Sequence, residues 1–292
     1  MLCGVLLLDK PVGLSSNAAL QRVRRLLSGV KAGHTGSLDP LASGMLPICL
    51  GEATKLAGEV LAGDKAYSFR ILLGTRTATG DAEGEVVERQ PVPRLDRARI
   101  EAVLAARLGE SLQVPPMYSA LKRQGEPLYR LARRGESVER AARVIRIHAL
   151  ELVAQGPDWL DLKVVCSKGT YVRVLGEDIA AALGTCGHLG ALRRDYVEPF
   201  RDRPMLTLEQ LAGRTGETDW LLPPDAAVPQ YPAVALDAGA AAALRHGRTV
   251  AGAAAAAAGT VRLHDERGQF MGLGERDATG RLKVRRLFAL PT

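Results

Sequence analysis

The sequence predicts an α+β fold with a mixed, mostly antiparallel sheet, followed by a small β-rich domain. Apolar alternation typical of half-buried strands recurs along the first two thirds of the chain, interrupted by helical periodicity. Consecutive strand patterns such as 143–154 and 159–167 lie too close together for the helical crossover that parallel neighbours need. After the Gly-, Pro- and Asp-rich stretch 213–232, short strand patterns dominate.

Strand and helix patterns alternate before that stretch. Ser15 or Ser16 can cap the first helix, which runs to about Leu27 with its apolar residues on one face. Residues 66–74 alternate between apolar and polar side chains and therefore predict a half-buried strand. The other expected strands are 3–9, 45–50, 143–154, 159–167 and a run that closes near Phe200. The other expected helices are 52–61, 95–108, 127–134 and 170–183, while 75–85 is polar and turn-rich.

The stretch 213–232 is expected to be a linker between a domain of residues 1–212 and a smaller domain of residues 233–292. Within the smaller domain, residues 251–258 are alanine-rich and predict a loop or a weak helix. Strand patterns in the same domain predict a small all-β module, and they cover 260–264, 269–274 and 283–290.

The charge of the chain points to a polyanionic partner. The net charge is +7 and the isoelectric point is near 9.4, a balance that favours nucleic acid binding. A basic housekeeping protein with no such partner is the alternative that charge alone leaves open. Aromatic residues make up only 4%, so a platform that stacks single-stranded bases is not the main binding device. No helix-turn-helix or zinc finger indicates DNA. No apolar stretch is long enough to span a membrane and no signal peptide is visible, so we expect a cytoplasmic protein.

Cysteines and histidines give no sign of a metal site. The four cysteines form no Cys-x-x-Cys pair, and the five histidines are dispersed without ligand spacing. We therefore expect reduced thiols, no disulfides and no metal.

A Gly-rich loop at 33–47 is the feature most typical of a functional site. It carries one imidazole, His34, and one carboxylate, Asp39, on a backbone shaped by three glycines and two prolines. Such a loop can present a carboxylate in a fixed direction. An Asp before a proline also commonly serves only to shape a turn, so the residues alone leave both roles open.

The segment 33–55 resembles the signature of the bacterial TruB family of tRNA pseudouridine synthases. Four further blocks resemble the family in the same order, and the match covers about residues 2–200. These blocks are 4–11, 67–81, 114–122 and 166–173, followed by Leu192-Arg193-Arg194. The C-terminal part resembles the PUA-like RNA-binding domain of the family.

The resemblance implies that the chain isomerises uridine 55 in the T loop of tRNA. The reaction needs no cofactor, because nothing is oxidised and no group is imported. The target base must be flipped out of the loop. The resemblance assigns Asp39 as the nucleophile, Arg173 as its ion-pair partner, and Tyr67 as a residue that stacks on the base and assists proton transfer. Attack on the sugar, attack on the base and a glycal route all stay open.

The resemblance also assigns substrate-binding residues. Tyr171 and Leu192 line the uridine pocket, and His34 inserts into the T loop. Core packing is the alternative for the first two residues, and bonding within its own loop is the alternative for His34. The implied partner is the tRNA T arm, with no obligate protein partner, and we expect a monomer. Basic residues expected to contact phosphates are Arg22, Arg24, Arg25, Lys31, Lys122, Arg123, Arg130, Arg133 and Arg134.

Two other functions compete with this hypothesis. One is an RNA-binding or RNA-folding protein in which catalysis is secondary or lost, although a pure binder need not keep Asp39, Tyr67 and Arg173. The other is a glycoside hydrolase, which would need a second placed carboxylate. Asp81 and Glu83 are the nearest acidic residues in the polar region, and both are poor candidates there.

Overall fold

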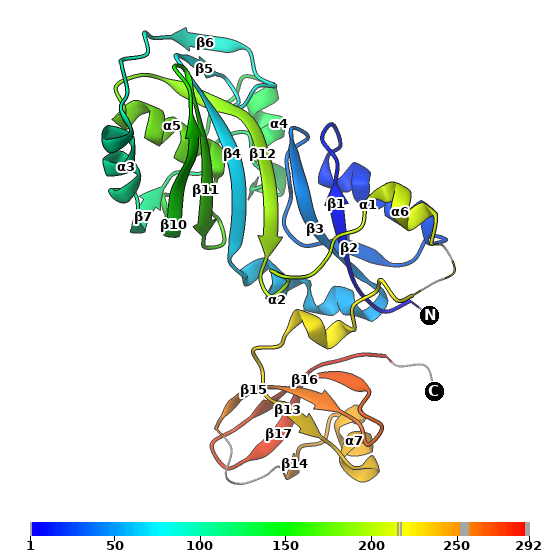
Figure 1. Ribbon diagram of the computed structural model, residues 1–292. Coiled ribbons are helices and arrows are strands. Elements are labelled where there is room, and N and C mark those ends of the chain that lie inside the picture. The colour runs from blue at the N-terminus through cyan, green and yellow to red at the C-terminus, as the bar shows by residue number, and fades with distance from the viewer. Residues whose placement is uncertain (1, 215, 217, 252–256, 290–292) are drawn as a thin grey trace.

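The computed structural model describes residues 2–214, 216, 218–251 and 257–289, and an eight-stranded sheet forms its larger part (Figure 1). The strand order is β1-β3-β12-β4-β11-β10-β7, and β2 pairs along β3. β12 pairs with β3 in parallel and with β4 in antiparallel fashion, so the sheet is mixed as predicted. Its strands are β1 (Gly4–Lys10), β2 (Ala32–His34), β3 (Ala42–Leu50), β4 (Lys65–Leu73), β7 (Gly109–Gln113), β10 (Arg143–Gln155), β11 (Trp159–Cys166) and β12 (Gly187–Val197).

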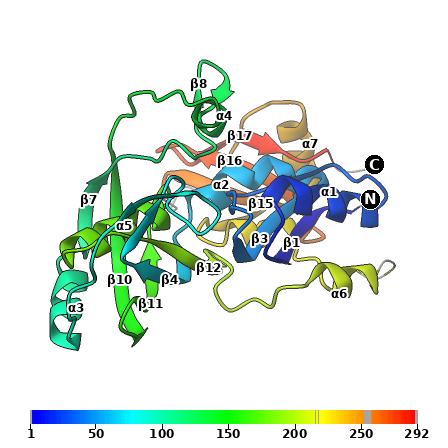
Figure 2. The same cartoon turned by 90° about the horizontal axis from the view of Figure 1, so that it is seen from above.

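Two helices, α3 (Arg97–Ala105) and α5 (Val172–Ala182), cover one face of this sheet (Figure 2). The alternation in β4 explains the packing. Phe69 and Ile71 point into a core that also contains Ile179 of α5, whereas Ser68 and Arg70 point to the opposite face. The strand predicted at 66–74 is therefore confirmed as half-buried.

A second core lies where α1 (Ser16–Leu26) packs on β1 and β3. Leu6 and Leu8 meet Leu20 and Val23 there, together with residues of α6 (Leu208–Ala212). Of the two serines that could cap the helix, Ser15 is the N-cap and accepts a hydrogen bond from the backbone of Ala18. The helix expected at 52–61 is divided into a 3-10 turn, η1 (Gly51–Leu56), and α2 (Ala57–Ala62).

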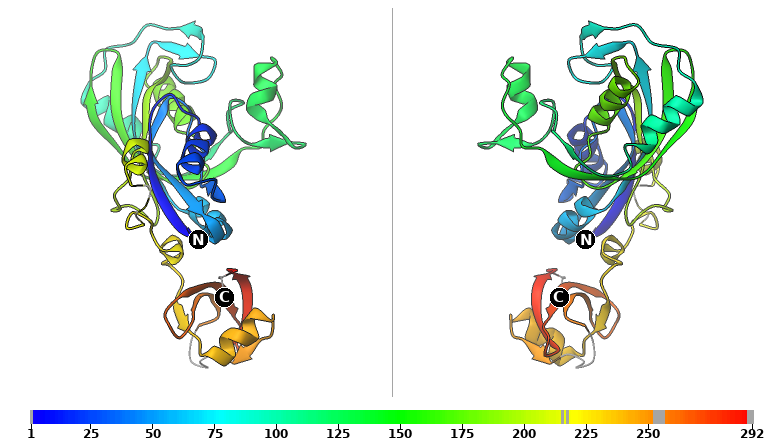
Figure 3. Two further views of the ribbon diagram at one scale, coloured as in Figure 1. Left: turned by 90° about the vertical axis from the view of Figure 1, so that its right-hand side faces the viewer. Right: turned by 90° about the vertical axis from the view of Figure 1, so that its left-hand side faces the viewer.

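An arm projects from the sheet after β7, on the same side as α1 (Figure 3). It consists of the hairpin β8 (Lys122–Arg123) and β9 (Glu126–Pro127), followed by α4 (Leu128–Arg133). The short helix at 127–134 was predicted, but the hairpin was not. A second unpredicted hairpin is formed by β5 (Thr75–Thr77), at the start of the stretch 75–85 that was expected to be turn-rich, and β6 (Val86–Arg89), directly after it.

The C-terminal domain holds five strands in the order β13-β15-β16-β17-β14. The expectation of an all-β module is wrong, because helix α7 (Ala238–Arg245) packs against β14 and β17. Alanines favour the helix and Asp237 caps it, accepting from the backbone of Ala240. The alanine-rich stretch at 251–258 lies mostly outside the described residues. The strands are β13 (Ala233–Ala235), β14 (Val250–Ala251), β15 (Gly259–His264), β16 (Phe270–Arg276) and β17 (Arg281–Leu287).

Part of the segment 213–232 packs against the large sheet. Val5 and Leu222 exchange backbone hydrogen bonds of 2.9 and 3.0 Å, and the 3-10 turn η2 (Pro224–Ala227) follows. Val228 is fully buried in a core that also contains Phe288 of the C-terminal domain. The domain boundaries themselves stay a prediction. No helix in the described part of the chain is both long and apolar enough to cross a membrane.

Candidate active site

The loop that carries Asp39 connects β2 to β3 and is held by hydrogen bonds where it enters β3. The backbone of Ala42 donates to the carbonyl of Asp39 over 3.0 Å, and the backbone of Gly13 donates to the carbonyl of Pro40 over 2.8 Å. Leu38, next to Asp39, is buried in the same core as Tyr67. Leu38 anchors the loop in the core, and the adjacent Asp39 side chain stays 41% exposed.

Arg173 is the partner of Asp39, as the resemblance implied. It sits in the first turn of α5, and its Nε atom lies 3.1 Å from Oδ2 of Asp39. The arginine side chain is only 6% exposed. Its two terminal nitrogens donate to the carbonyls of Thr79 at 2.7 Å and Tyr118 at 2.6 Å. A planar guanidinium with every nitrogen engaged has one orientation, and this orientation directs Nε at the carboxylate.

Asp81 is a site residue that the sequence analysis set aside as a poor candidate. Its Oδ2 lies 3.8 Å from Nε of Arg173, and its side chain is 5% exposed. Thr79 Oγ1 donates to its Oδ1 over 2.5 Å, and the backbone of Glu83 donates to the same atom. Asp81 is therefore a buried counter-charge for Arg173. The β5–β6 hairpin places Asp81 beside Arg173, and no local pattern in residues 75–85 predicts this hairpin.

The electrostatics of Asp39 reflect these neighbours. Burial raises the pKa of the Asp39 carboxyl above its ordinary value, and Arg173 opposes this shift. The charge of Asp81 raises the pKa further, while Lys10 lowers it. Lys10 is itself fully buried, and burial lowers its pKa to about 8. Burial and Asp81 thus favour the protonated form of Asp39, whereas Arg173 and Lys10 favour its ionised form.

Tyr67 and Arg194 form the floor beside this pair. Tyr67 is buried, and burial raises the pKa of its phenol while Arg194 opposes the shift, so the phenol stays protonated near neutral pH. Arg194 donates to the carbonyls of Met45 at 2.7 Å and Gly36 at 3.1 Å, which ties β12 to the Asp39 loop. Arg194 stands in a block that resembles the family, although the resemblance alone assigned it no role.

The other predicted site residues lie around this floor. Tyr171 precedes α5 and is half-buried, and Leu192 of β12 packs partly buried against the core that contains Tyr67. His34 lies on β2, and burial lowers the pKa of its imidazole, with a further lowering by Arg194. Its Nδ1 atom is buried without a hydrogen-bond partner among the described residues. The geometry therefore brings Asp39 and Arg173 into direct contact and leaves the substrate-binding roles as predictions.

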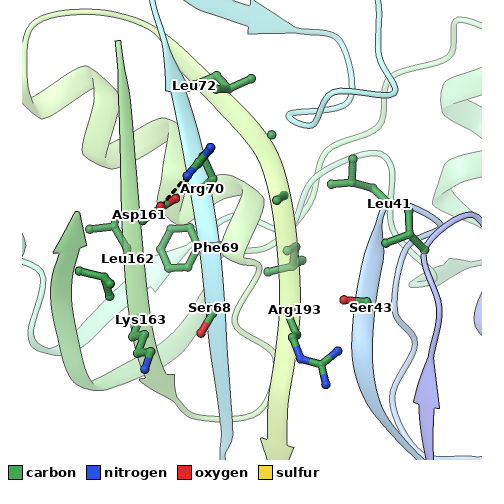
Figure 4. A pocket seen from close by; sticks show the side chains of 15 residues that line it. Leu41, Ser43, Ser68, Phe69, Arg70, Leu72, Asp161, Leu162, Lys163 and Arg193 are labelled. Carbon is green, nitrogen blue, oxygen red and sulfur yellow. Dashed lines mark hydrogen bonds and ion pairs between the residues drawn. The ribbon is translucent and has the colours of Figure 1, made fainter. Parts of the chain in front are cut away.

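A groove of about 710 Å³ lies on the face of the sheet opposite to the one that α3 and α5 cover (Figure 4). Ser68, Arg70 and Asp161 line it, and Arg70 makes a two-pronged ion pair with Asp161 at 2.6 Å. Leu192 is the one predicted site residue in its lining. The described residues contain no cluster of three or more His, Cys, Asp or Glu side chains that could hold a metal ion.

Three family models match the chain in succession. Residues 24–172 match the N-terminal domain of the TruB family of pseudouridylate synthases. Residues 173–228 match the C-terminal domain of tRNA pseudouridylate synthase B, and residues 232–288 match the C-terminal model of pseudouridine synthase II TruB.

Curated relatives agree over almost the whole length. The chain is 52% identical over 286 residues to tRNA pseudouridine synthase B of Aromatoleum aromaticum, covering 97% of this chain and 92% of the relative. It is 50% identical over 290 residues to the protein of the same name from Stutzerimonas stutzeri, covering 97% and 95%.

Solved structures share the fold. A chain in an H/ACA RNP bound to a substrate RNA containing 2′-deoxyuridine superposes with a TM-score of 0.74 at 24% identity, covering 99% of this chain and 85% of that one. A chain in a Cbf5-Nop10-Gar1 complex gives a TM-score of 0.73 at 25% identity, covering 97% and 84%. The predicted α+β pseudouridine synthase fold is thereby confirmed. The chain belongs to the TruB family of pseudouridylate synthases, which are isomerases.

Proposed function

We propose that this chain isomerises uridine 55 in the T loop of tRNA to pseudouridine, with Asp39 as the nucleophile and the base flipped into the site. The relatives' name, tRNA pseudouridine synthase B, supports conversion of uridine to pseudouridine in tRNA. The observation that carries the finer proposal is the ion pair of Asp39 and Arg173, in which a partly exposed carboxylate is held 3.1 Å from a buried guanidinium.

The chemistry asks little beyond a placed carboxylate. The bond between C1′ of the ribose and N1 of the base breaks, the base turns, and C5 bonds to C1′. C5 loses one proton and N1 gains one, so atoms and electrons balance without an oxidant or a reductant. As the nucleophile, the Asp39 carboxylate donates an electron pair to either the sugar or the base. It holds that fragment after the C1′–N1 bond breaks and until the C1′–C5 bond forms. Arg173 keeps the carboxylate ionised and aimed.

The neighbouring side chains have roles that fit this reaction. The ring of Tyr67 offers an apolar face on which a pyrimidine can stack. Its protonated phenol can donate a hydrogen bond to the base as the base turns. Leu192 packs against the same core, and Tyr171 is the N-cap of α5 two residues before Arg173, so both are proposed to line the uridine pocket. His34, on the strand that leads into the Asp39 loop, is proposed to enter the space that the flipped base leaves.

Binding of the T arm is proposed to use the side of the sheet that carries α1 and the arm (Figure 3). Arg22, Arg24 and Arg25 lie on α1, and Arg130 lies on α4. Arg134 is less available, because it is paired with Glu126 at 2.7 Å and with Glu136 at 2.7 Å. The C-terminal domain is proposed to act as a PUA-like RNA-binding domain, and the whole chain to work in the cytoplasm as a monomer.

The test is a map of modified uridines in an unmodified tRNA transcript that has been incubated with the purified chain and no cofactor. We expect pseudouridine at position 55 and nowhere else in the transcript, and none when that position is changed to cytidine. Modification at another uridine, or dependence on a second protein, would contradict the assignment. Light scattering of the purified chain tests the monomer separately.

A further inference from the structure

Ser16 is almost fully buried and holds both backbone polar groups of one residue. Its Oγ accepts a hydrogen bond from the N–H of Leu38 at 2.7 Å and donates to the C=O of Leu38 at 3.0 Å. Only 2% of Ser16 is exposed, and the two residues are 22 positions apart. Leu38 directly precedes Asp39, so this single hydroxyl fixes the backbone that carries the carboxylate.

Gln113 makes the equivalent contact on the other side of the site. Its Oε1 accepts from the N–H of Tyr171 at 2.8 Å, and its Nε2 donates to the C=O of Tyr171 at 3.2 Å. The glutamine is 5% exposed at the end of the edge strand β7, 58 positions from its partner. Tyr171 is the N-cap of α5 and lacks a capping side chain of its own, and Arg173 follows two residues later.

The same stretch of chain reaches Arg173 a second time. Five residues after Gln113, the carbonyl of Tyr118 accepts from Nη2 of Arg173 at 2.6 Å. The segment from Gln113 to Tyr118 therefore holds the start of α5 in two places, at the backbone of Tyr171 and at the guanidinium of Arg173. Without the Gln113 bridge, only one of these two ties would remain.

We propose that Ser16 and Gln113 are positioning residues for the reaction, which set the separation and direction of the Asp39–Arg173 pair by holding the backbone of Leu38 and of Tyr171. The proposal rests on the proposed roles of Asp39 and Arg173. Neither side chain reaches the reacting atoms. Each side chain makes two hydrogen bonds to backbone groups that would otherwise bond to exchanging water. Ser16 thereby fixes the backbone before Asp39, and Gln113 fixes the backbone before Arg173.

The chain offers matched controls. Ser15 is the exposed N-cap of the same helix, so Ser15→Ala weakens α1 without touching Leu38. Gln155 lies at the opposite end of β10 from Arg143, the residue that pairs with Gln113, and its Oε1 is buried, so Gln155→Met removes a glutamine from the same sheet without touching Tyr171. The test variants are Ser16→Ala and Gln113→Met. Ser16→Thr keeps the hydroxyl, and Gln113→Glu keeps the acceptor for the N–H of Tyr171.

The experiment measures the single-turnover rate on unmodified tRNA, the tRNA dissociation constant and the thermal midpoint for each variant. We expect Ser16→Ala and Gln113→Met to lower the single-turnover rate about 10- to 100-fold, because small misplacements of reacting groups carry such costs. The dissociation constant should change by less than about threefold, since binding in the ground state is not affected. Ser16→Thr should stay near the parent rate, and Gln113→Glu should fall between the parent and Gln113→Met.

A second readout separates positioning from simple loss of stability. The charged groups that act on Asp39 are Arg173, Asp81 and Lys10, and Glu83, Tyr67 and Tyr171 are titratable groups that also lie near it. A looser Arg173 lowers the pKa of Asp39 less. Gln113→Met should therefore move the acid limb of the rate profile to higher pH, whereas Gln155→Met should leave it in place. Gln113→Asn, which adds no charge and is too short to bridge both backbone groups of Tyr171, gives this same readout if Gln113→Met does not fold.

Parent rates in folded Ser16→Ala and Gln113→Met would overturn the proposal. Equal rate losses in Ser15→Ala and Ser16→Ala, or an unmoved acid limb in the Gln113 variants, would also overturn it, because the role would then be structural only. An active Asp39→Asn variant would instead refute the proposed function, so the two failures are distinguishable.

Discussion

Nε of Arg173 lies 3.1 Å from Asp39, and the arginine is 6% exposed while the aspartate is 41% exposed. Oδ2 of Asp81 lies 3.8 Å from the same nitrogen, and the Asp81 side chain is 5% exposed. The buried half of this arrangement is Arg173 with its counter-charge Asp81, and the partly exposed half is Asp39, the proposed nucleophile.

Replacing Arg173 with lysine tests the geometry of the anchor rather than its charge. Arg173→Lys keeps a cation but cannot serve Asp39 and the carbonyls of Thr79 and Tyr118 at once. We expect turnover to fall at least about 100-fold and the free energy of unfolding to fall by about 1–3 kcal/mol, from carbonyls left without donors. Single-turnover assays and urea denaturation measure both. Near-parent turnover would show that charge alone suffices.

The pH dependence follows from the raised pKa of Asp39. Burial favours the protonated form, so the ionised nucleophile is lost as the pH falls through a value above the ordinary range of an aspartate. We expect the single-turnover rate to drop on the acid side earlier than an ordinary aspartate allows. The profile from about pH 4 to about pH 8, with tRNA binding measured in parallel, provides the check. An acid limb at or below the ordinary aspartate pKa would contradict the assigned environment.

The same shift has a consequence for stability. A carboxyl whose pKa is higher in the folded than in the unfolded protein binds its proton more tightly when folded, so its ionisation destabilises the fold as the pH rises. At pH 7, Asp39→Asn should therefore unfold at the same temperature as the parent or a higher one, and any difference should shrink toward acidic pH. A clear loss of thermal stability at pH 7 would mean that the Asp39–Arg173 contact stabilises the fold.

Gly44 is required for a close approach between β3 and β12. Its φ is +100°, and a Cβ atom there would lie 2.2 Å from the carbonyl oxygen of Arg194. We expect Gly44→Ala to cost at least about 2 kcal/mol and to lower turnover, because β3 leads directly from the Asp39 loop. Gly33→Ala in β2 is the control, since nothing lies within 4 Å of a Cβ at that position. Equal midpoints for the two variants in thermal unfolding would refute the strain.

Phosphate contacts predict how salt weakens tRNA binding. Each cation that neutralises a phosphate adds about one unit to the slope of log affinity against log salt. We expect Arg130→Ala, on α4 of the arm, to reduce that slope by about one. Arg97→Ala, on α3, should leave it unchanged. Titrations at several salt concentrations decide the matter, and an unaltered slope for Arg130→Ala would remove this residue from the interface.

Local patterns predicted the elements whose own side chains determine them. The alternation of β4, the apolar face of α1 and the glycine stop after α5 each depend on neighbours within a few residues, and these elements were found close to the expected bounds. β7 was missed because its residues are mostly exposed, so its pairing with β10 leaves no apolar period to read. Helix α7 was missed because the short strand patterns around it dominated the interpretation.

The site divides in the same way. Asp39 and Arg173 stood in blocks that resembled the family, and the structure brings them into contact. Asp81, Arg194 and Gln113 act through contacts with segments far away in the chain, and a single sequence carries no local sign of such contacts. The two adjacent serines could not be told apart by pattern, yet one caps a helix and the other holds the backbone next to Asp39.

The most direct measurement compares catalysis and binding in Asp39→Asn. Unmodified tRNA is incubated with excess enzyme, and pseudouridine formation and the tRNA dissociation constant are measured for the parent, for Asp39→Asn and for Asp265→Asn, a turn residue of the C-terminal domain. The account predicts no product with Asp39→Asn, a dissociation constant within about threefold of the parent, and parent behaviour for Asp265→Asn. Product formed by Asp39→Asn at a rate close to that of the parent would contradict it.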